Sequence, residues 1–322
     1  MRAMYFLVGA FLVGIWLTDA HGQYVDEFPI ATADVGPNGI ISGPDGSLWF
    51  TEYGGNSIGN FDPISRHVIQ ELALPHADSV PTTIVSGPDA NLWFTESGNP
   101  RIGMVVPPST IAEFDLPSGL TSGDAMVADS GGYVWFSVYT GTGAGLARIS
   151  TDAMHVIQMY ELPPSANIGE VSGLTIGVDG NLWFTESSFG PHHIAVNPRL
   201  ARILMTNPND YAEFLIDGEF IEPVGIANGS DGNLWFTSQF GVVGSMPPSP
   251  PNTITEYATG AAITLGITKG PDNNIWYADV GLGAIGRITP SGTISVLAFR
   301  RHPYQQGLPS EQTTIFGLPI PD

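Results

Sequence analysis

Short apolar runs separated by turn residues recur along the whole chain. Six segments share one order of residue types: a turn with Gly and Asp, then an aliphatic residue, a Trp, an aromatic residue and a small residue. The first reads Gly43-Pro-Asp-Gly-Ser-Leu-Trp-Phe-Thr-Glu52. Alternating large and smaller side chains are typical of a β-strand, and Pro-Asp-Gly is typical of a tight turn. The pattern therefore predicts a repeat of strand-rich modules.

The spacing of the repeat indicates the architecture. The six Trp residues are 41 to 52 positions apart, and they are Trp49, Trp93, Trp135, Trp183, Trp235 and Trp276. Each interval also contains other short apolar runs, enough for four strands per module. Four antiparallel strands at this period are the signature of a β-propeller blade. We predict an all-β propeller of four-stranded antiparallel blades over residues 23–299, with six blades favoured and seven as the alternative.

Both ends of the chain differ from the repeat. Arg2 followed by the apolar run Met4 to Leu17 is typical of a cleaved secretory signal, so we assign residues 1–22 to a signal peptide. The mature protein is then expected to be secreted or periplasmic, without stable membrane insertion. An outer-strand pattern at Val25–Ile30 is surplus to six blades, and residues 300–322 form a tail. This strand and the tail could pair with a neighbouring chain in an oligomer.

Charge narrows the choice of partners. The formal net charge is −21, and Lys269 is the only lysine. A strongly anionic surface repels nucleic acid and anionic lipid, so nucleic-acid binding is excluded as a function. The chain has no Cys, so its stability has to come from the packed core alone. A small molecule or another protein remains as the expected partner.

The repeat motif also carries a family resemblance. The combination of Gly-x-Asp-Gly-Asn-Leu-Trp-Phe-Thr-Glu, as at 177–186, with Ile-Gly-Arg-Ile at 285–288 and Ile-Thr-Glu-Tyr at 254–257 resembles the streptogramin B lyase (virginiamycin B lyase) family. The resemblance implies a propeller, seven-bladed in the known enzymes, and a Mg²⁺-assisted elimination that opens a cyclic depsipeptide at its ester. It also implies a His base eleven residues before a blade Trp. A Glu three residues after that Trp and a second His would help to hold the metal.

The chain keeps the acidic residues of this arrangement but not its His base. The residues three after each Trp include four acids, but none of the residues eleven before is His. The latter are Asn38, Thr82, Asp124, Ser172, Val224 and Leu265. A general base must lie within hydrogen-bond reach and titrate near the working pH, which Asn, Thr and Ser do not do unaided. The resemblance therefore predicts the fold but does not predict lyase activity.

The remaining acidic positions are the candidate site. We expect the carboxylates at the mouth of the channel to be Glu52, Glu96, Glu186, Asp279 and Asp124. Such a ring could recruit Mg²⁺ or Ca²⁺, and Glu186 with His192 or His193 is the candidate metal site. Alternatively, each Glu hydrogen-bonds backbone amides of a neighbouring blade, and the two His residues lie on a solvent-exposed loop.

Two functions stay open from the sequence. The first is a ligand- or protein-binding scaffold that lacks the lyase base. The second is a divergent metal-assisted lyase or hydrolase that acts at the channel mouth.

Overall fold

The computed structural model describes most of the propeller region. Described are residues 3–8, 11–16, 25–30, 32, 35–141, 143–162, 168–189, 195–217, 222–260 and 263–298. No helix of this part is long and apolar enough to cross a membrane. His192, His193 and the tail 300–322 lie outside the described residues.

Six four-stranded antiparallel sheets form the blades. The strands of blades 1 to 3 are β4 (Pro37–Ser42), β5 (Leu48–Glu52), β6 (Ser57–Asp62), β7 (His67–Ala73), β8 (Pro81–Ser86), β9 (Leu92–Glu96), β10 (Arg101–Val106), β11 (Thr110–Asp115), β12 (Thr121–Ala128), β13 (Tyr133–Thr140), β14 (Gly143–Ser150) and β15 (Ile157–Tyr160). Those of blades 4 to 6 are β16 (Glu170–Ile176), β17 (Leu182–Phe189), β18 (Ala195–Leu204), β19 (Asn207–Leu215), β20 (Pro223–Asn228), β21 (Leu234–Ser238), β22 (Val242–Met246), β23 (Thr255–Ala258), β24 (Thr264–Lys269), β25 (Ile275–Asp279), β26 (Ala284–Ile288) and β27 (Ile294–Ala298).

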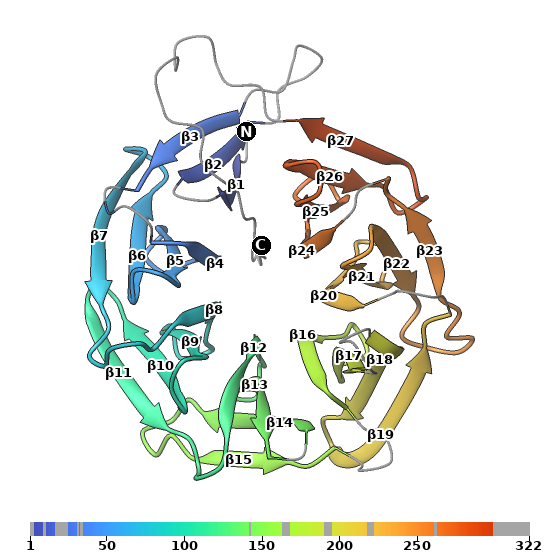
Figure 1. The fold of residues 1–322 in the computed structure, drawn as a ribbon, viewed down its shortest axis with the longest axis horizontal. Coiled ribbons are helices and arrows are strands. Elements are labelled where there is room, and N and C mark those ends of the chain that lie inside the picture. The colour runs from blue at the N-terminus through green and yellow to red at the C-terminus, as the bar shows by residue number, and fades with distance from the viewer. Residues whose placement is uncertain are drawn as a thin grey trace.

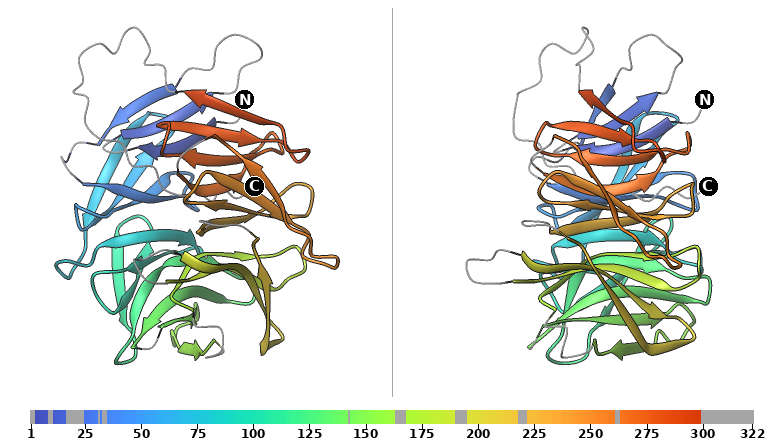
Figure 2. Two further views of the ribbon diagram at one scale, coloured as in Figure 1. Left: turned by 45° about the vertical axis from the view of Figure 1, so that its right-hand side comes forward. Right: turned by 90° about the vertical axis from the view of Figure 1, so that its right-hand side faces the viewer.

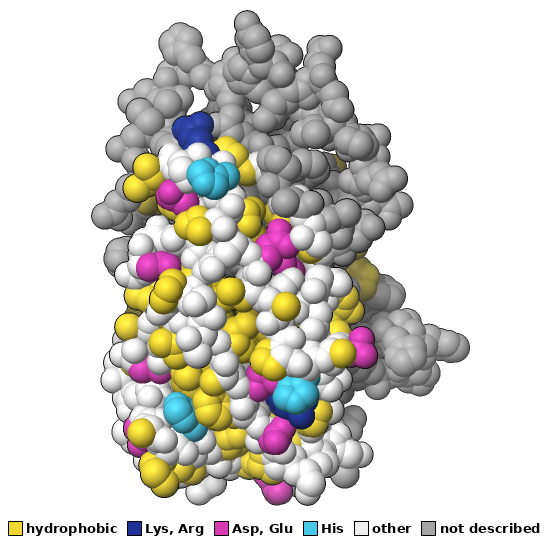
Figure 3. Space-filling view, turned by 90° about the vertical axis from the view of Figure 1, so that its left-hand side faces the viewer, with side chains coloured by type: hydrophobic (Ala, Val, Ile, Leu, Met, Phe, Trp, Pro, Cys, Tyr) yellow, Lys and Arg dark blue, Asp and Glu magenta, His cyan; other side chains and the backbone are white. Residues whose placement is uncertain are grey.

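The blades stand around a central channel (Figure 1), and each runs from an innermost first strand to an outer fourth strand. The side views in Figure 2 show the same sheets stacked face to face. The predicted six-bladed propeller is therefore confirmed. On the flank formed by blades 1 and 2, charged side chains are scattered among apolar and uncharged ones (Figure 3). The exposed apolar residues there include Ile64 and Ile69.

A three-stranded sheet lies between blade 6 and blade 1 (Figure 1). Its strands are β1 (Ala3–Val8), β2 (Phe11–Trp16) and β3 (Val25–Pro29), in the order β1-β2-β3. The surplus strand seen in the sequence is thus β3, and it pairs with β2. The signal peptide at 1–22 and the oligomer through β3 and the tail both stay predictions.

Each blade Trp is held by a hydrogen bond to the turn that precedes it. The indole Nε1 of Trp49 donates to Asp45 Oδ1 at 3.1 Å, and that of Trp276 donates to Asp272 Oδ1 at 2.8 Å. Blade 3 lacks the Asp at this position, and Trp135 donates instead to Asp129 Oδ2, at 2.8 Å. Because a buried N–H without an acceptor is costly, the turn Asp allows each Trp to be fully buried. The sequence motif had been interpreted as turn chemistry alone.

The Trp rings pack across the gaps between blades. Trp49 belongs to one apolar cluster with Ile84, Leu92 and Phe94 of the next blade. Burying an aromatic side chain of this size removes about 150 to 250 Å² from water. The Trp of each of the first five blades therefore joins its own blade to the next one.

A hydroxyl two residues after the Trp adds a polar link between blades. Thr51 Oγ1 donates to the backbone oxygen of Thr82 in blade 2 at 2.6 Å and accepts from the backbone N–H of Gly39 at 2.8 Å. Thr185 makes the same inter-blade bond to Val224 O at 2.8 Å. Blade 6 has Ala278 at this position, so it has no such hydroxyl. Thr237 makes the inter-blade bond to Leu265 O, whereas Thr95 bonds to Thr82 of its own blade. The link therefore joins blade 1 to blade 2, blade 4 to blade 5 and blade 5 to blade 6.

Thr51→Val tests how much this inter-blade hydrogen bond contributes to the stability of the protein. The substitution keeps the shape but leaves the backbone groups of Gly39 and Thr82 unpaired in a buried place. We expect the free energy of unfolding in urea to fall by about 1 to 3 kcal/mol. The matched control is Thr110→Val on the exposed edge of β11, which should change it by less than about 0.5 kcal/mol. Equal effects of the two substitutions would contradict this role.

Candidate functional site

The central channel is the main cavity of the described structure. Its volume is about 740 Å³, and its wall is made by the innermost strands of all six blades. The polar and charged residues in this wall include Asn38, Thr83, Asp124, Ser172, Asn228 and Lys269. A cavity of this size falls within the range of small-molecule sites.

The residues eleven before each Trp lie on the innermost strands or at their starts. Asn38, Asp124 and Ser172 are part of the channel wall. Thr82 is buried instead and shares a hydrogen bond with Thr95 at 2.7 Å. In three of the six blades, the position at which the resemblance implies a His base therefore lines the channel, and its one ionisable occupant is Asp124.

Carboxyl groups from three blades influence one another around Asp124. Burial raises the pKa of Asp124, while the Thr82 hydroxyl opposes the shift. Burial also raises the pKa of Glu170, which accepts a hydrogen bond from Ser172 Oγ at 3.0 Å and is raised further by the charge of Asp124. The pKa of Glu222 is raised by burial and by Glu170. These groups therefore hold protons more readily than ordinary carboxyls.

A tyrosine belongs to the same group. Burial raises the pKa of the Tyr139 hydroxyl, and the charges of Glu170 and Asp124 raise it further. It therefore stays protonated and can donate a hydrogen bond. We refer to Asp124, Tyr139, Glu170 and Glu222 as the acidic end of the channel.

Three of these four residues were missed in the sequence. Glu170 and Glu222 both lie thirteen residues before a Trp, and Tyr139 lies four after one. The repeated offset of the two Glu residues was the available signal. Gln239, also four after a Trp, donates to Glu222 Oε1 at 2.9 Å.

The acidic residues three positions after a Trp do not lie at the channel mouth, where the sequence predicted them. Glu52, Glu96, Glu186 and Asp279 are at most 1% exposed, and none of them is part of the channel wall. They end or interrupt the second strands, so the first strand of the blade separates them from the channel. Of the five predicted acidic residues, Asp124 alone lines the channel.

Side chains of the same blade satisfy some of these carboxylates. Glu52 accepts from Ser57 Oγ, and Glu186 accepts from the Tyr211 hydroxyl at 2.9 Å. The Arg199 guanidinium lies 3.6 Å from Glu186. The neighbouring blade's amides, expected as the alternative partners, are not the ones that these two carboxylates use.

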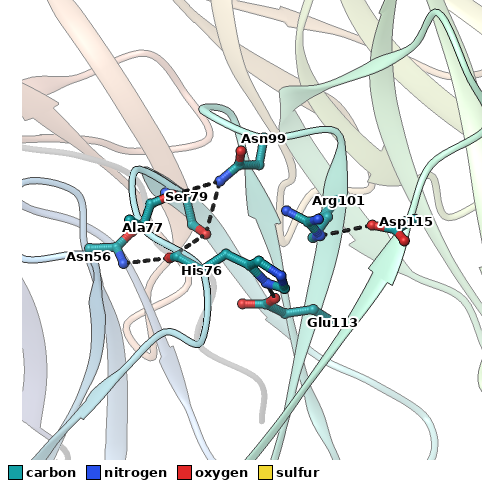
Figure 4. A network of polar contacts seen from close by, with 8 residues as sticks. All are labelled: Asn56, His76, Ala77, Ser79, Asn99, Arg101, Glu113 and Asp115. Atoms are coloured by element: carbon teal, nitrogen blue, oxygen red, sulfur yellow. Dashed lines mark hydrogen bonds and ion pairs between the residues drawn. The ribbon is translucent and has the colours of Figure 1, made fainter.

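Glu96 has no such partner. It is fully buried, and neither carboxylate oxygen has a hydrogen bond among the described residues. Beside it, a polar network joins blades 1 and 2 (Figure 4), in which His76 contacts Glu113 on β11 and Arg101 binds Asp115 at 2.8 Å. Glu113 also leaves one oxygen unpaired. Burial raises the pKa of Glu96, so its protonated form is favoured.

The described residues do not fit the Mg²⁺ site that the resemblance implies. No group of three His, Asp or Glu side chains in the described ranges is arranged to hold a metal ion. Glu186 is engaged by Tyr211, and its predicted partners His192 and His193 lie outside those ranges. No reaction step is therefore assigned to a metal here.

The buried carboxyls predict a stability that falls with rising pH. Burial raises the pKa of Glu52, Glu96 and Glu186 to about 7 in the folded protein, from 4.5. A raised pKa contributes stability that is complete below 4.5 and is lost as the pH rises through about 7. We expect Glu96→Gln, which mimics the protonated form, to raise the free energy of unfolding at pH 8 by at least about 1 kcal/mol.

Urea unfolding at pH 4.5 and pH 8 checks this expectation. The gain from Glu96→Gln should disappear at pH 4.5, because the native side chain is already protonated there. Asp210→Asn at an exposed position is the control and should have no such pH dependence. A pH-independent effect of Glu96→Gln would contradict the raised pKa.

Comparisons with known proteins place this fold. The model of the virginiamycin B lyase family matches residues 15–194 and 172–305. A streptogramin B lyase structure is 28% identical, with a TM-score of 0.74 over 87% of this chain and 88% of that one. Virginiamycin B lyase from Staphylococcus aureus is 28% identical, with a TM-score of 0.71 over 85% and 87%.

A further structure shows a catalytically inactive His-to-Ala variant of the Staphylococcus aureus enzyme with quinupristin. It is 27% identical, with a TM-score of 0.71 over 84% of this chain and 87% of that one. A comparison with curated proteins gives no match. Because the family model covers most of the propeller, the chain belongs to the virginiamycin B lyase family.

Proposed function

We propose that this protein is an exported binding propeller that holds a small peptide-like molecule in its central channel and leaves it intact. The observation that carries the proposal is a channel of about 740 Å³ with both apolar and polar side chains in its wall and no His at the family's base position. The proposal of export rests on the signal peptide predicted at residues 1–22.

The wall suits binding better than elimination. Asn38 and Ser172 occupy base positions in the channel, and both offer hydrogen bonds without taking up a proton at neutral pH. Backbone and side-chain polar groups around an apolar lining are the usual composition of a ligand pocket. Ile41, Val85 and Met126 supply apolar surface in the same wall.

Quinupristin, which is bound by the inactive Staphylococcus aureus variant, is a suitable probe. We expect isothermal titration to show binding with one site per chain, and chromatography with mass detection to show an unchanged compound after prolonged incubation. Ser172→Trp should fill the channel and weaken binding at least tenfold. Ser109→Trp in the exposed β10–β11 turn is the control and should leave binding unchanged. Absence of binding to the native protein would contradict the proposal.

A second function is favoured by Asp124. It occupies a base position in the channel, and burial raises its pKa above the ordinary value of an aspartate. In this alternative the protein is a divergent lyase or hydrolase. Ring opening of quinupristin would then replace intact binding.

The product distinguishes the two reactions. Elimination opens the ring without a change in mass, whereas hydrolysis of the ester adds the mass of one water. Either product should be lost with Asp124→Asn and retained with Asp210→Asn. If product forms at the native rate with Asp124→Asn, Asp124 is not the base.

A metal role can be measured separately. We expect neither Mg²⁺ nor Ca²⁺ to raise the Tm, because Tyr211 already occupies the carboxylate of Glu186. At a free-ion concentration of 100 times the Kd, an ion that binds only the folded protein would raise the free energy of unfolding by about 2.7 kcal/mol. A rise in Tm that is lost with Glu186→Gln would instead establish the metal site at Glu186.

A further inference from the structure

Lys269 is unusual in both number and place. It is the only lysine in a chain with 31 acidic residues, and it ends the innermost strand β24. It is half-buried and part of the channel wall. Within the described residues it has no hydrogen bond or ion pair. A lone ammonium group in a partly enclosed wall attracts an anionic group more strongly than one on the open surface.

Asn228 lies at the same level in the adjacent blade. Asn228 and Lys269 are each seven residues before their blade Trp, and both line the channel. The Asn228 amide nitrogen donates to Ile176 O at 2.7 Å, but its Oδ1 is buried without a donor. This end of the channel therefore carries a cation from one blade and an amide side chain from the adjacent blade.

The acidic end lies at a different level of the same channel. Asp124 is eleven residues before its Trp, so it is four strand positions from the level of Lys269. At about 3.3 Å per residue, four positions span at most about 13 Å along the channel, and the register shift of β12 between Ser122 and Met126 shortens this span. Lys269 therefore places a positive charge near one end of the channel, and Asp124 places a negative charge near the other.

We propose that the channel selects a linear zwitterion, with its carboxylate at Lys269 and its ammonium group at Asp124. This inference rests on the proposed function, because it takes the channel to be the binding site. The ligand class is a short peptide with free ends, and the spacing fits about four residues.

The net charge favours a zwitterion over a simple ion. A chain with a charge of −21 repels anions over about 8 Å at physiological salt, so a plain carboxylate approaches poorly. A plain cation is attracted to the whole surface and gains no preference for the channel. A ligand without net charge avoids both effects, and the two ends of the channel fix its orientation.

Tetra-alanine with free ends is the probe, and isothermal titration is the measurement. Blocking either end, by N-acetylation or by C-terminal amidation, should weaken binding about tenfold, as expected for the loss of one charge-assisted hydrogen bond. Di-alanine reaches only about 7 Å and should also bind at least tenfold more weakly. Equal binding of the free and blocked peptides would overturn the inference, and so would no binding of tetra-alanine.

Substitutions assign the two ends. With Lys269→Met, free and amidated peptides should bind equally, while acetylation should still weaken binding. With Asp124→Asn the pattern should reverse. Arg66→Gln and Asp210→Asn are exposed controls that should leave both preferences unchanged. If Lys269→Met keeps the preference for the free carboxylate, Lys269 is not the anchor.

The quinupristin measurement separates this inference from the proposed function. Binding of quinupristin without binding of tetra-alanine would refute the zwitterion and keep the channel as a ligand site. Failure of both probes would refute both.

Discussion

The hydrogen bond from each Trp to its turn Asp is the interaction on which the rest of the structure depends. The indole ring supplies the largest apolar surface between neighbouring blades, but its N–H cannot be buried without an acceptor. The Asp that shapes the turn provides that acceptor in every one of the six blades, as Asp45 does for Trp49. The variation in blade 3 supports this view, because Asp129 provides the carboxylate from a different position in the turn.

This arrangement separates the parts of the chain that hold the ring together from those that line the channel. The second strands carry the Trp, the linking hydroxyl and the buried acid, all enclosed between blades. The first strands face the channel, and at the level eleven residues before the Trp they carry a different residue in each blade. The family's fold can therefore persist while residues such as Asn38, Asp124 and Ser172 replace a catalytic His.

The buried acids three after the Trp show how an identical motif position acquires different surroundings. Ser57 bonds one oxygen of Glu52 and leaves the other unpaired, Tyr211 and Arg199 surround Glu186, and neither oxygen of Glu96 has a hydrogen bond among the described residues. Because burial penalises the charged form in all three, their shared property is a raised pKa rather than a shared ligand. Their repetition in the sequence thus reflects the blade interior and not a ring around the channel.

The sequence by itself determined the repeat, the blade size and the absence of His at the family's base position, and it favoured six blades over seven; the structure decided the number. These are local properties, because strand alternation, turn residues and spacing act over a few dozen residues. Only the tertiary structure decided which charged groups meet. Glu170 and Glu222 join Asp124 from different blades, and Lys269 shares a channel with residues far away in the chain. Closure of the ring brings these residues together, and no local pattern encodes which side chains of a repeated strand will face the axis.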